Sequence, residues 1–260
     1  MKNLLKEKMD KQERCIGSLL TTGGTGTVEA LALSGFDFII IDTEHGPFDV
    51  ESSIDMICAA KLRGMTPFVR VKDGMRSSIL KMLDVGAEGL IVPNVHTVDE
   101  VKKLVEYAKY FPLGQRGVGM ARTAGFGEDP YIKENGVLKY FEICNKETLL
   151  IPQCETKECL DNIKEIVSID GVDGIFIGPF DLSVALGKPL QFSTGEFEYA
   201  LMRICSIVKA AGKILMGYVG NVEDALKSFS RGYDAVSVST DVNILITRAK
   251  EIVAQCKYNS

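Results

Sequence analysis

The chain has few features that would suit nucleic acid or a membrane. Its 260 residues carry a net charge of −5, and lysine and arginine form no basic run longer than a few residues. Phosphate binding requires clustered cations, so we do not expect nucleic acid as a partner. The longest apolar runs are strand-sized, far short of the roughly 20 residues that span a bilayer. The charged N-terminal stretch also lacks the apolar core of a signal peptide.

Cysteine and histidine are both used sparingly. The seven cysteines are scattered and form no CxxC pair, which is typical of reduced thiols and predicts a cytoplasmic location. Of the two histidines, His96 precedes a predicted helix and is interpreted as a surface or loop residue. The other, His45, follows an apolar run in the stretch DTEHGPFD, between carboxylates and a Gly-Pro turn. It is either a candidate base or a hydrogen-bonding turn residue.

Short apolar runs alternate with amphipathic stretches along the whole chain. Eight runs are predicted to be buried strands: residues 15–20, 38–41, 67–71, 89–92, 149–153, 174–177, 214–217 and 235–238. The predicted helices between them include residues 50–62, 77–84, 98–109, 156–166, 196–211 and 221–228. Continuously apolar strands are typical of a parallel sheet covered on both faces. The alternation predicts a (β/α)8 barrel, as a single α/β domain over residues 1–260.

A doubly wound open sheet is the alternative fold. It would require a glycine-rich phosphate turn after the first strand, and Gly23, Gly24 and Gly26 do lie there. Their spacing is not GxGxxG, however, and no acidic ribose partner follows at the expected place. We therefore interpret the glycines as a turn beside the site. The longest irregular stretch, residues 111–129, is expected to be functional or mobile.

Polar side chains follow several of the predicted strands, where barrel enzymes place their active sites. Glu155 and Asp181 are separated by one strand-helix-strand repeat, so neighbouring strands can bring the two carboxylates together. Two carboxylates in a dry pocket repel unless a cation or a proton separates them, and oxygen ligands favour Mg²⁺ or Mn²⁺. Either residue could instead cap the helix that follows it, and the spacing leaves both interpretations open. Cys154 lies between Gln153 and Glu155 and is interpreted as a packing residue, because alternate side chains of a strand point to opposite faces.

Arg70 ends the third predicted strand, next to the strand that leads to His45. Its position supports a catalytic role for His45, or it could form a structural ion pair with Asp42 or Glu44. Two lysines at predicted strand edges, Lys72 and Lys213, are weak candidates for a Schiff base.

Six separated blocks of the sequence resemble the HpcH/HpaI family of metal-dependent pyruvate aldolases. They are GFDFIIIDTEHGPFD, PFVRV, MLDVGAEGLIVP, GQRGVG, IPQCET and GVDGIFIGPFDLS. The resemblance implies a barrel of the phosphoenolpyruvate/pyruvate type. It also implies that the C-terminal helix packs on a neighbouring subunit and that dimers assemble into a hexamer, a trimer of dimers.

The same resemblance implies roles for particular residues. Those matching Glu155 and Asp181 hold the metal, and the one matching Gln153 lies beside it. The residue matching His45 is the base, Asp84 orients it, and Arg70 contacts the keto acid. The backbone matching the segment after the sixth predicted strand holds the carboxylate of pyruvate. This segment consists of Gly178, Pro179, Phe180 and Asp181.

The sequence departs from the family pattern on the aldehyde side of the pocket. It has no tryptophan, where relatives often carry one in the first strand, and it has Phe180 where several have a small residue. The stretches after RGVG and near the last strand, where the chain reads VSVSTD, also differ. These changes leave the candidate metal ligands and base intact.

The residues together predict a carbon-carbon lyase. A divalent ion, Mg²⁺ or Mn²⁺ with Co²⁺ as a further candidate, would act as a Lewis acid while His45 takes the proton of a 4-hydroxyl group. A 4-hydroxy-2-oxo acid would then be cleaved to pyruvate and an aldehyde. One alternative is an acyl-CoA-type lyase of a related barrel, although the chain lacks a basic cluster suited to CoA phosphates. The other is a non-catalytic keto-acid-binding barrel.

Overall fold

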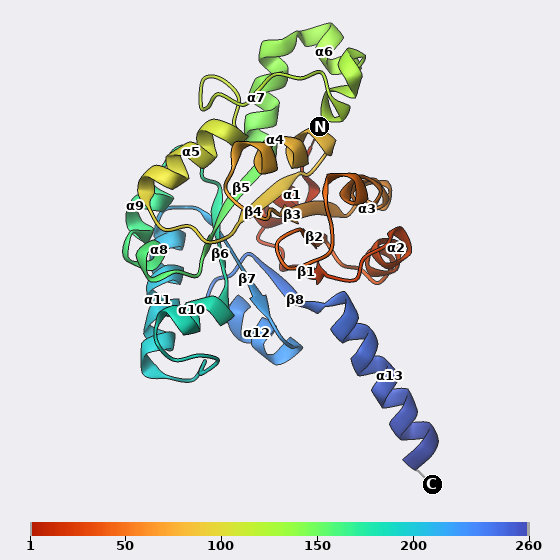
Figure 1. Cartoon of the computed structure of the whole chain (residues 1–260), viewed down its shortest axis with the longest axis vertical. Helices are drawn as coiled ribbons and strands as arrows, with labels where there is room; N and C mark the ends of the chain where they lie inside the picture. The colour runs from red at the N-terminus through yellow and green to blue at the C-terminus, as the bar shows by residue number, and fades with distance from the viewer. Residues whose placement is uncertain (1, 259–260) are drawn as a thin grey trace.

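Eight parallel strands close into a barrel in the computed structural model, which describes residues 2–258 (Figure 1). The strands are β1 (Cys15–Leu20), β2 (Phe38–Asp42), β3 (Thr66–Arg70), β4 (Gly89–Val92), β5 (Leu149–Cys154), β6 (Gly174–Ile177), β7 (Ile214–Val219) and β8 (Ala235–Thr240). Each strand pairs with its neighbour in sequence, and β1 pairs with β8 to close the sheet. The predicted barrel is confirmed, and the open-sheet alternative is wrong.

Helices connect the strands and surround the barrel. They are α1 (Leu4–Asp10), α2 (Thr25–Leu33), α3 (Val50–Leu62), α4 (Arg76–Val85), α5 (Val98–Ala108), α6 (Pro130–Asn135), α7 (Val137–Glu147), α8 (Lys157–Asp161), α9 (Ile163–Val167), α10 (Pro179–Ala185), α11 (Gly195–Ala210), α12 (Val222–Ser230) and α13 (Asp241–Tyr258). The helix predicted over residues 156–166 is in fact two short helices, because the helix is interrupted at Asn162. The irregular stretch contains one 3-10 helix, η1 (Arg122–Gly127).

The interior of the barrel is filled by large side chains. Phe38 and Phe68 meet edge to face, with ring centroids 5.8 Å apart. Their rings occupy the space where Cβ atoms of Gly17 and Gly89 would lie, at 2.3 and 2.1 Å, so only glycine fits at those two strand positions. Leu5 of α1 joins this inner cluster, which continues to the amino ends of the strands.

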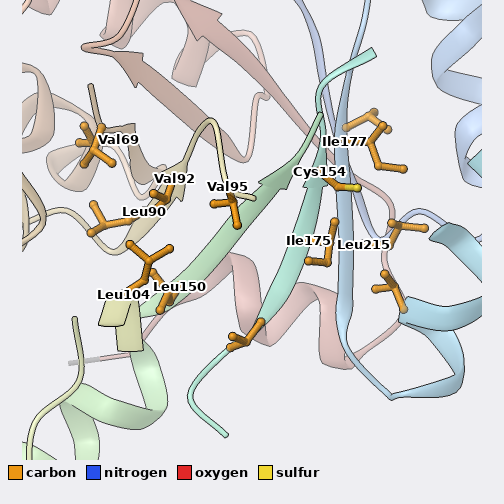
Figure 2. Close-up of a cluster of buried hydrophobic side chains, with 14 of the residues drawn as sticks. Val69, Leu90, Val92, Val95, Leu104, Leu150, Cys154, Ile175, Ile177 and Leu215 are labelled. Atoms are coloured by element: carbon orange, nitrogen blue, oxygen red, sulfur yellow. The ribbon is translucent and has the colours of Figure 1, made fainter. Parts of the chain in front are cut away.

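A second apolar layer lies between the strands and the surrounding helices. Figure 2 shows part of it, where Ile175 and Ile177 of β6 lie beside Cys154 of β5 and Leu215 of β7. Strands buried on both faces explain the continuously apolar runs in the sequence. Cys154 is fully buried in this layer, which confirms its interpretation as a packing residue.

The C-terminal helix α13 projects away from the barrel (Figure 1). Apolar side chains along it are exposed, with Leu245 at 68% and Ile252 at 48%. An apolar helix face in contact with water is unusual unless another surface covers it. Packing of this helix on a neighbouring subunit stays a prediction. Within residues 2–258, none of the helices combines the length and apolar character needed to cross a membrane.

The carboxylate of Asp241 joins the start of α13 to the loop after β1. It accepts hydrogen bonds from the backbone N–H groups of Thr21, Thr22 and Gly23 and from both threonine hydroxyls, at 2.6–3.3 Å. These N–H groups are therefore not available to a phosphate. The glycine run is a turn beside the site, as predicted, and no nucleotide loop.

Candidate functional site

A cavity of about 440 Å³ opens at the carboxyl ends of the strands. Its lining comes from strands β1 to β8 and the loops after them, from the first turn of α10 and from Asn243 in the first turn of α13. The lining consists of Leu19, Thr21, Ile40, Asp42, His45, Arg70, Ile91, Gln153, Phe176, Gly178, Pro179, Phe180, Asp181, Tyr218, Thr240 and Asn243. Most of the polar residues predicted at strand ends therefore meet in one place.

Asp42 organises the turn that carries His45. Its buried carboxylate accepts two hydrogen bonds from Arg70, at 2.9 and 2.7 Å, and also bonds from the backbone N–H groups of Glu44 and His45. Gly46 closes the turn, because a Cβ there would lie 2.1 Å from the carbonyl oxygen of Asp42. The ion pair considered for Arg70 exists, and it holds the guanidinium at the cavity wall.

The imidazole of His45 is accessible. Its side chain is 70% exposed, and the nearest carboxylate oxygen is Oε2 of Glu44, 3.9 Å from Nε2. That oxygen is buried and has no hydrogen-bond partner, although Arg70 Nε lies 3.4 Å away. Burial raises the pKa of Glu44, and the charge of Arg70 opposes this shift. The imidazole can therefore reach a bound molecule, with one acidic neighbour at its side.

Glu155 is buried next to Gln153 and Gly178, which line the cavity, and does not itself line it. Its Oε1 accepts from the backbone N–H of Asn94 at 2.6 Å, and its Oε2 accepts from the amide of Gln153. Burial is the main cause of its raised pKa, and the nearby charge of Asp181 adds to it. Gln153 and Gly178 lie next to Glu155 and line the cavity together with Asp181.

The helix-capping interpretation of these carboxylates is wrong. Helix α8 is capped by Thr156, whose hydroxyl accepts from the N–H of Cys159, so Glu155 has no capping role. Asp181 lies in the first turn of α10, and that helix has no side-chain cap. Neither carboxylate is therefore explained as a helix cap.

The donor set fits a hard divalent cation. Glu155 and Asp181 supply carboxylate oxygens, and the buried Oε1 of Gln153 has no hydrogen-bond partner. Gly178 packs against this group, since a Cβ there would lie 2.7 Å from Glu155 Oε2 and 2.8 Å from Gln153 Nε2. Among residues 2–258, no cluster of three or more His, Cys, Asp and Glu side chains offers a closed metal site. Two carboxylates and an amide oxygen instead leave positions open for substrate, which suits catalysis.

Some predicted residues lie elsewhere. Asp84 is near the end of α4, at the amino end of the barrel, where it pairs with Arg116 at 2.8 Å. It therefore does not orient His45 within one chain. His96 is a surface residue as predicted, with Nε2 3.1 Å from the side-chain oxygen of Asn94. Lys72 and Lys213 do not line the cavity, so neither supports a Schiff base.

Several residues at the site had no predicted role, among them Asn94, Tyr218 and Asn243. Asn94 supplies an N–H group to Glu155 from a left-handed backbone conformation, with φ of 53°. Tyr218 and Asn243 line the cavity. The seventh strand was predicted to end at residue 217, one residue before Tyr218. The observed β7 ends two residues later, at Val219. A prediction with this later end would have included Tyr218 among the residues at the carboxyl ends of the strands.

The fold and the position of the cavity define this protein as a TIM barrel with a candidate active site at the carboxyl ends of its strands. The chain belongs to the family described as HpcH/HpaI aldolase/citrate lyase, whose family model matches residues 24–247.

Individual relatives agree over almost the whole chain. The chain is 34% identical over 260 residues to a hydroxypyruvate/pyruvate aldolase from Roseobacter denitrificans (strain ATCC 33942 / OCh 114), covering 98% of this chain and 97% of that protein. It is 34% identical to a 2-keto-3-deoxy-L-rhamnonate aldolase from Escherichia coli O17:K52:H18 (strain UMN026 / ExPEC), over 92% of this chain and 87% of that protein. An HpcH/HpaI aldolase/citrate lyase family protein from Burkholderia cenocepacia J2315 superimposes with a TM-score of 0.90 at 29% identity, covering 98% and 99% of the two chains.

Proposed function

We propose that this chain is a divalent-metal-dependent pyruvate aldolase, which reversibly cleaves a 4-hydroxy-2-oxo acid to pyruvate and an aldehyde. The observation that carries the proposal is the convergence of five side chains at the carboxyl ends of β2, β3, β5 and β6: His45, Arg70, Gln153, Glu155 and Asp181. Membership of an aldolase family supports it.

Glu155 and Asp181 are the proposed metal ligands, with Gln153 beside them. When bound, Mg²⁺ or Mn²⁺, or alternatively Co²⁺, would supply Lewis-acid stabilisation of the negative charge that develops on the 2-oxo group. Gln153 would hold the Glu155 carboxylate through its amide N–H and present its unpaired Oε1 to the cavity.

Arg70 and His45 divide the remaining chemistry. Arg70 is fixed by Asp42 and would place a permanent positive charge beside the oxo acid in ground and transition states. His45 would accept the proton of the 4-hydroxyl group during cleavage and return it during addition. The backbone at the start of α10, from Gly178 through Pro179 and Phe180, is proposed to bind the carboxylate of pyruvate.

Self-association is part of the proposal. The exposed apolar face of α13 would pack on a second copy, and dimers would assemble into a hexamer in the cytoplasm. Asp84 lies too far along α4 to reach His45 of its own chain, so an orienting role would need Asp84 of another copy. Mixing His45→Ala with Asp84→Asn chains tests this: recovery of activity in the mixed oligomer is expected, and no recovery contradicts it.

The metal assignment is tested with matched variants. Glu155→Gln should lower divalent-ion affinity, measured by calorimetry, and should abolish pyruvate release from 4-hydroxy-2-oxo acids. Glu158→Gln, on the exposed surface of α8, is the control and should behave like the wild type. Full activity in excess chelator, or a covalent adduct trapped by borohydride, would contradict the metal mechanism.

The base assignment needs a pH profile. His45→Ala should slow cleavage by about 10²- to 10⁴-fold while pyruvate binding stays nearly unchanged, because the proton transfer matters only in the transition state. If His45 is the base, the pH–rate profile of the wild type should contain a limb that is missing in the variant. His96→Ala is the matched control. Near-normal cleavage by His45→Ala would show that the stretch DTEHGPFD is only a structured turn.

A further inference from the structure

The candidate catalytic cavity shares a wall with a second cavity. Pro179, Phe180 and Tyr218 line both of them, and the second has a volume of about 460 Å³. It lies outside the ends of β6 and β7 and is lined by residues of α10, α11 and α12, which lie on the same side of the barrel in Figure 1. Two ring side chains and a proline therefore separate the reaction site from a space as large as the site itself.

A row of aromatic rings runs from one cavity into the other. The ring of Phe180 lies 5.6 Å from Tyr218 at 45° and 5.6 Å from Phe192 at 61°. Phe192 in turn lies 5.4 Å from Phe197 at 62°. Tilted and edge-to-face contacts at 4.5–7 Å are the favoured arrangement of aromatic pairs, so a further ring could join the row in the same geometry.

Phe180 is incompletely covered by its neighbours. It remains 47% exposed despite its two ring contacts, and it directly precedes the candidate metal ligand Asp181. Exposed apolar surface beside a reaction centre is favourably covered by an apolar part of a ligand. The backbone at Phe180 is proposed to bind the carboxylate of pyruvate, whereas its ring lines both cavities, so the ring can contact a part of the substrate that extends from the reaction site toward the second cavity.

The charged residues of the second cavity are already paired. Lys227 contacts Glu223 at 2.8 Å, and Arg231 contacts Glu198 at 2.7 Å. A second carboxylate on the substrate would have to compete with these partners. A chain of hydroxyl groups placed against the rings of Phe180 and Phe192 would lose hydrogen bonds to water that the rings themselves cannot replace. An apolar, planar group meets neither difficulty.

We propose that the aldehyde partner of this site carries an aromatic ring, which Phe180, Tyr218 and Phe192 hold at the entrance of the second cavity. This inference rests on the proposed aldolase function. In the addition direction, the methyl group of pyruvate loses a proton and its carbon bonds to the carbonyl carbon of an aryl aldehyde. The carbonyl oxygen takes up a proton, and a 4-aryl-4-hydroxy-2-oxo acid forms without any oxidant.

The test compares two aldehydes in the same metal-saturated enzyme. The ratio of kcat/KM for benzaldehyde to that for glyceraldehyde removes general effects on activity. Phe180→Ala and Phe192→Ala should each lower this ratio by about 10-fold or more, the range in which apolar contacts discriminate substrates. Phe180→Leu keeps the apolar volume but removes the ring, and it should lower the ratio as well. This variant keeps the test valid if Phe180→Ala does not fold.

Tyr199→Ala is the matched control, because Tyr199 is an exposed aromatic on α11 that lines neither cavity. Its ratio should equal that of the wild type. Tyr218→Phe retains the ring and should retain the preference for benzaldehyde. Equal losses for both aldehydes in the Phe180 and Phe192 variants, or loss of the preference in Tyr218→Phe, would overturn the inference.

Two further measurements separate this inference from the aldolase function. Saturation-transfer NMR should show benzyl alcohol, which has the ring but no carbonyl group, bound to the wild type and released by Phe180→Ala. Metal-dependent proton exchange at the methyl group of pyruvate reports the aldolase chemistry without any aldehyde. Exchange together with a ratio that does not respond to the ring variants would refute only the aromatic subsite. Absence of exchange with every metal would refute both.

Discussion

Replacing Asp241 by asparagine tests how the last helix is anchored to the barrel. Oδ1 accepts from the N–H and hydroxyl of Thr21, and Oδ2 accepts from the N–H and hydroxyl of Thr22 and from the N–H of Gly23. An amide has only one acceptor oxygen, so its NH₂ group would face two or three donors. Hydrogen bonds to a charged group contribute about 1.5–3 kcal/mol each, and some rearrangement will recover part of the loss. We expect a destabilisation of about 2–4 kcal/mol, a Tm lower by roughly 4–8 °C.

The lowered pKa of the Asp241 carboxyl gives a second figure for the stabilisation that these hydrogen bonds contribute. Burial of the Asp241 carboxyl opposes ionisation, but hydrogen bonds from Thr22, Thr21 and Gly23 outweigh burial and lower its pKa from 3.8 to about 2. A carboxyl group with a depressed folded-state pKa stabilises the fold above its unfolded pKa and loses that contribution as pH falls. The shift corresponds to about 2 kcal/mol, present above pH 4 and lost toward pH 2.

The assay is thermal unfolding of wild type and Asp241→Asn between pH 7 and pH 2, at one protein concentration. The two Tm values should differ most at neutral pH and converge below pH 4. Asp224→Asn is the control, because it makes the same Asp-to-Asn change on the exposed surface of α12. Equal Tm values for Asp241→Asn and wild type at pH 7 would refute the anchoring role. A difference that persists undiminished at the lowest pH at which both fold would refute the electrostatic part.

Three further predictions concern assembly and the site. A chain ending near residue 240 should lose its oligomeric state and most of its stability, because the apolar face of α13 is then missing; a full-length protein that sediments as a monomer of about 28 kDa contradicts this. Gly178→Ala should weaken divalent-ion binding by about 10-fold, since its Cβ would displace the Glu155 carboxylate; calorimetry with an unchanged affinity would show that the loop simply adapts. Arg70→Lys should reduce kcat/KM by at least 10-fold, because lysine cannot make the two-bond contact with Asp42; steady-state kinetics near wild-type values would mean that charge alone suffices.

Much of the fold was predictable because parallel barrels have a strong local signal. All eight strands were found within two residues of their bounds, since strands covered on both faces must be apolar throughout. Helix starts also have a local signal: Thr97 and Asn221 cap α5 and α12, because threonine and asparagine side chains satisfy free N–H groups in the first turn. The interruption between α8 and α9 at Asn162 has no comparable signal in the sequence.

The candidate site was only partly readable. Alternation along β5 identified Gln153 and Glu155, and the repeat length related them to Asp181. The choice between capping and metal binding required tertiary contacts, because both roles use a carboxylate just after a strand. Thr156 occupies the cap of α8, and that fact decides the question for Glu155.

By itself, the sequence determined the closed α/β barrel and the edge of the sheet at which polar residues gather, because both follow from periodicity and from the direction of parallel strands. Only the tertiary structure decided which distant groups meet. It joined Asp42 to Arg70, separated Asp84 from His45, and placed Tyr218 against Phe180. Such contacts depend on the register and closure of the sheet, which bring together residues that have no local pattern in common.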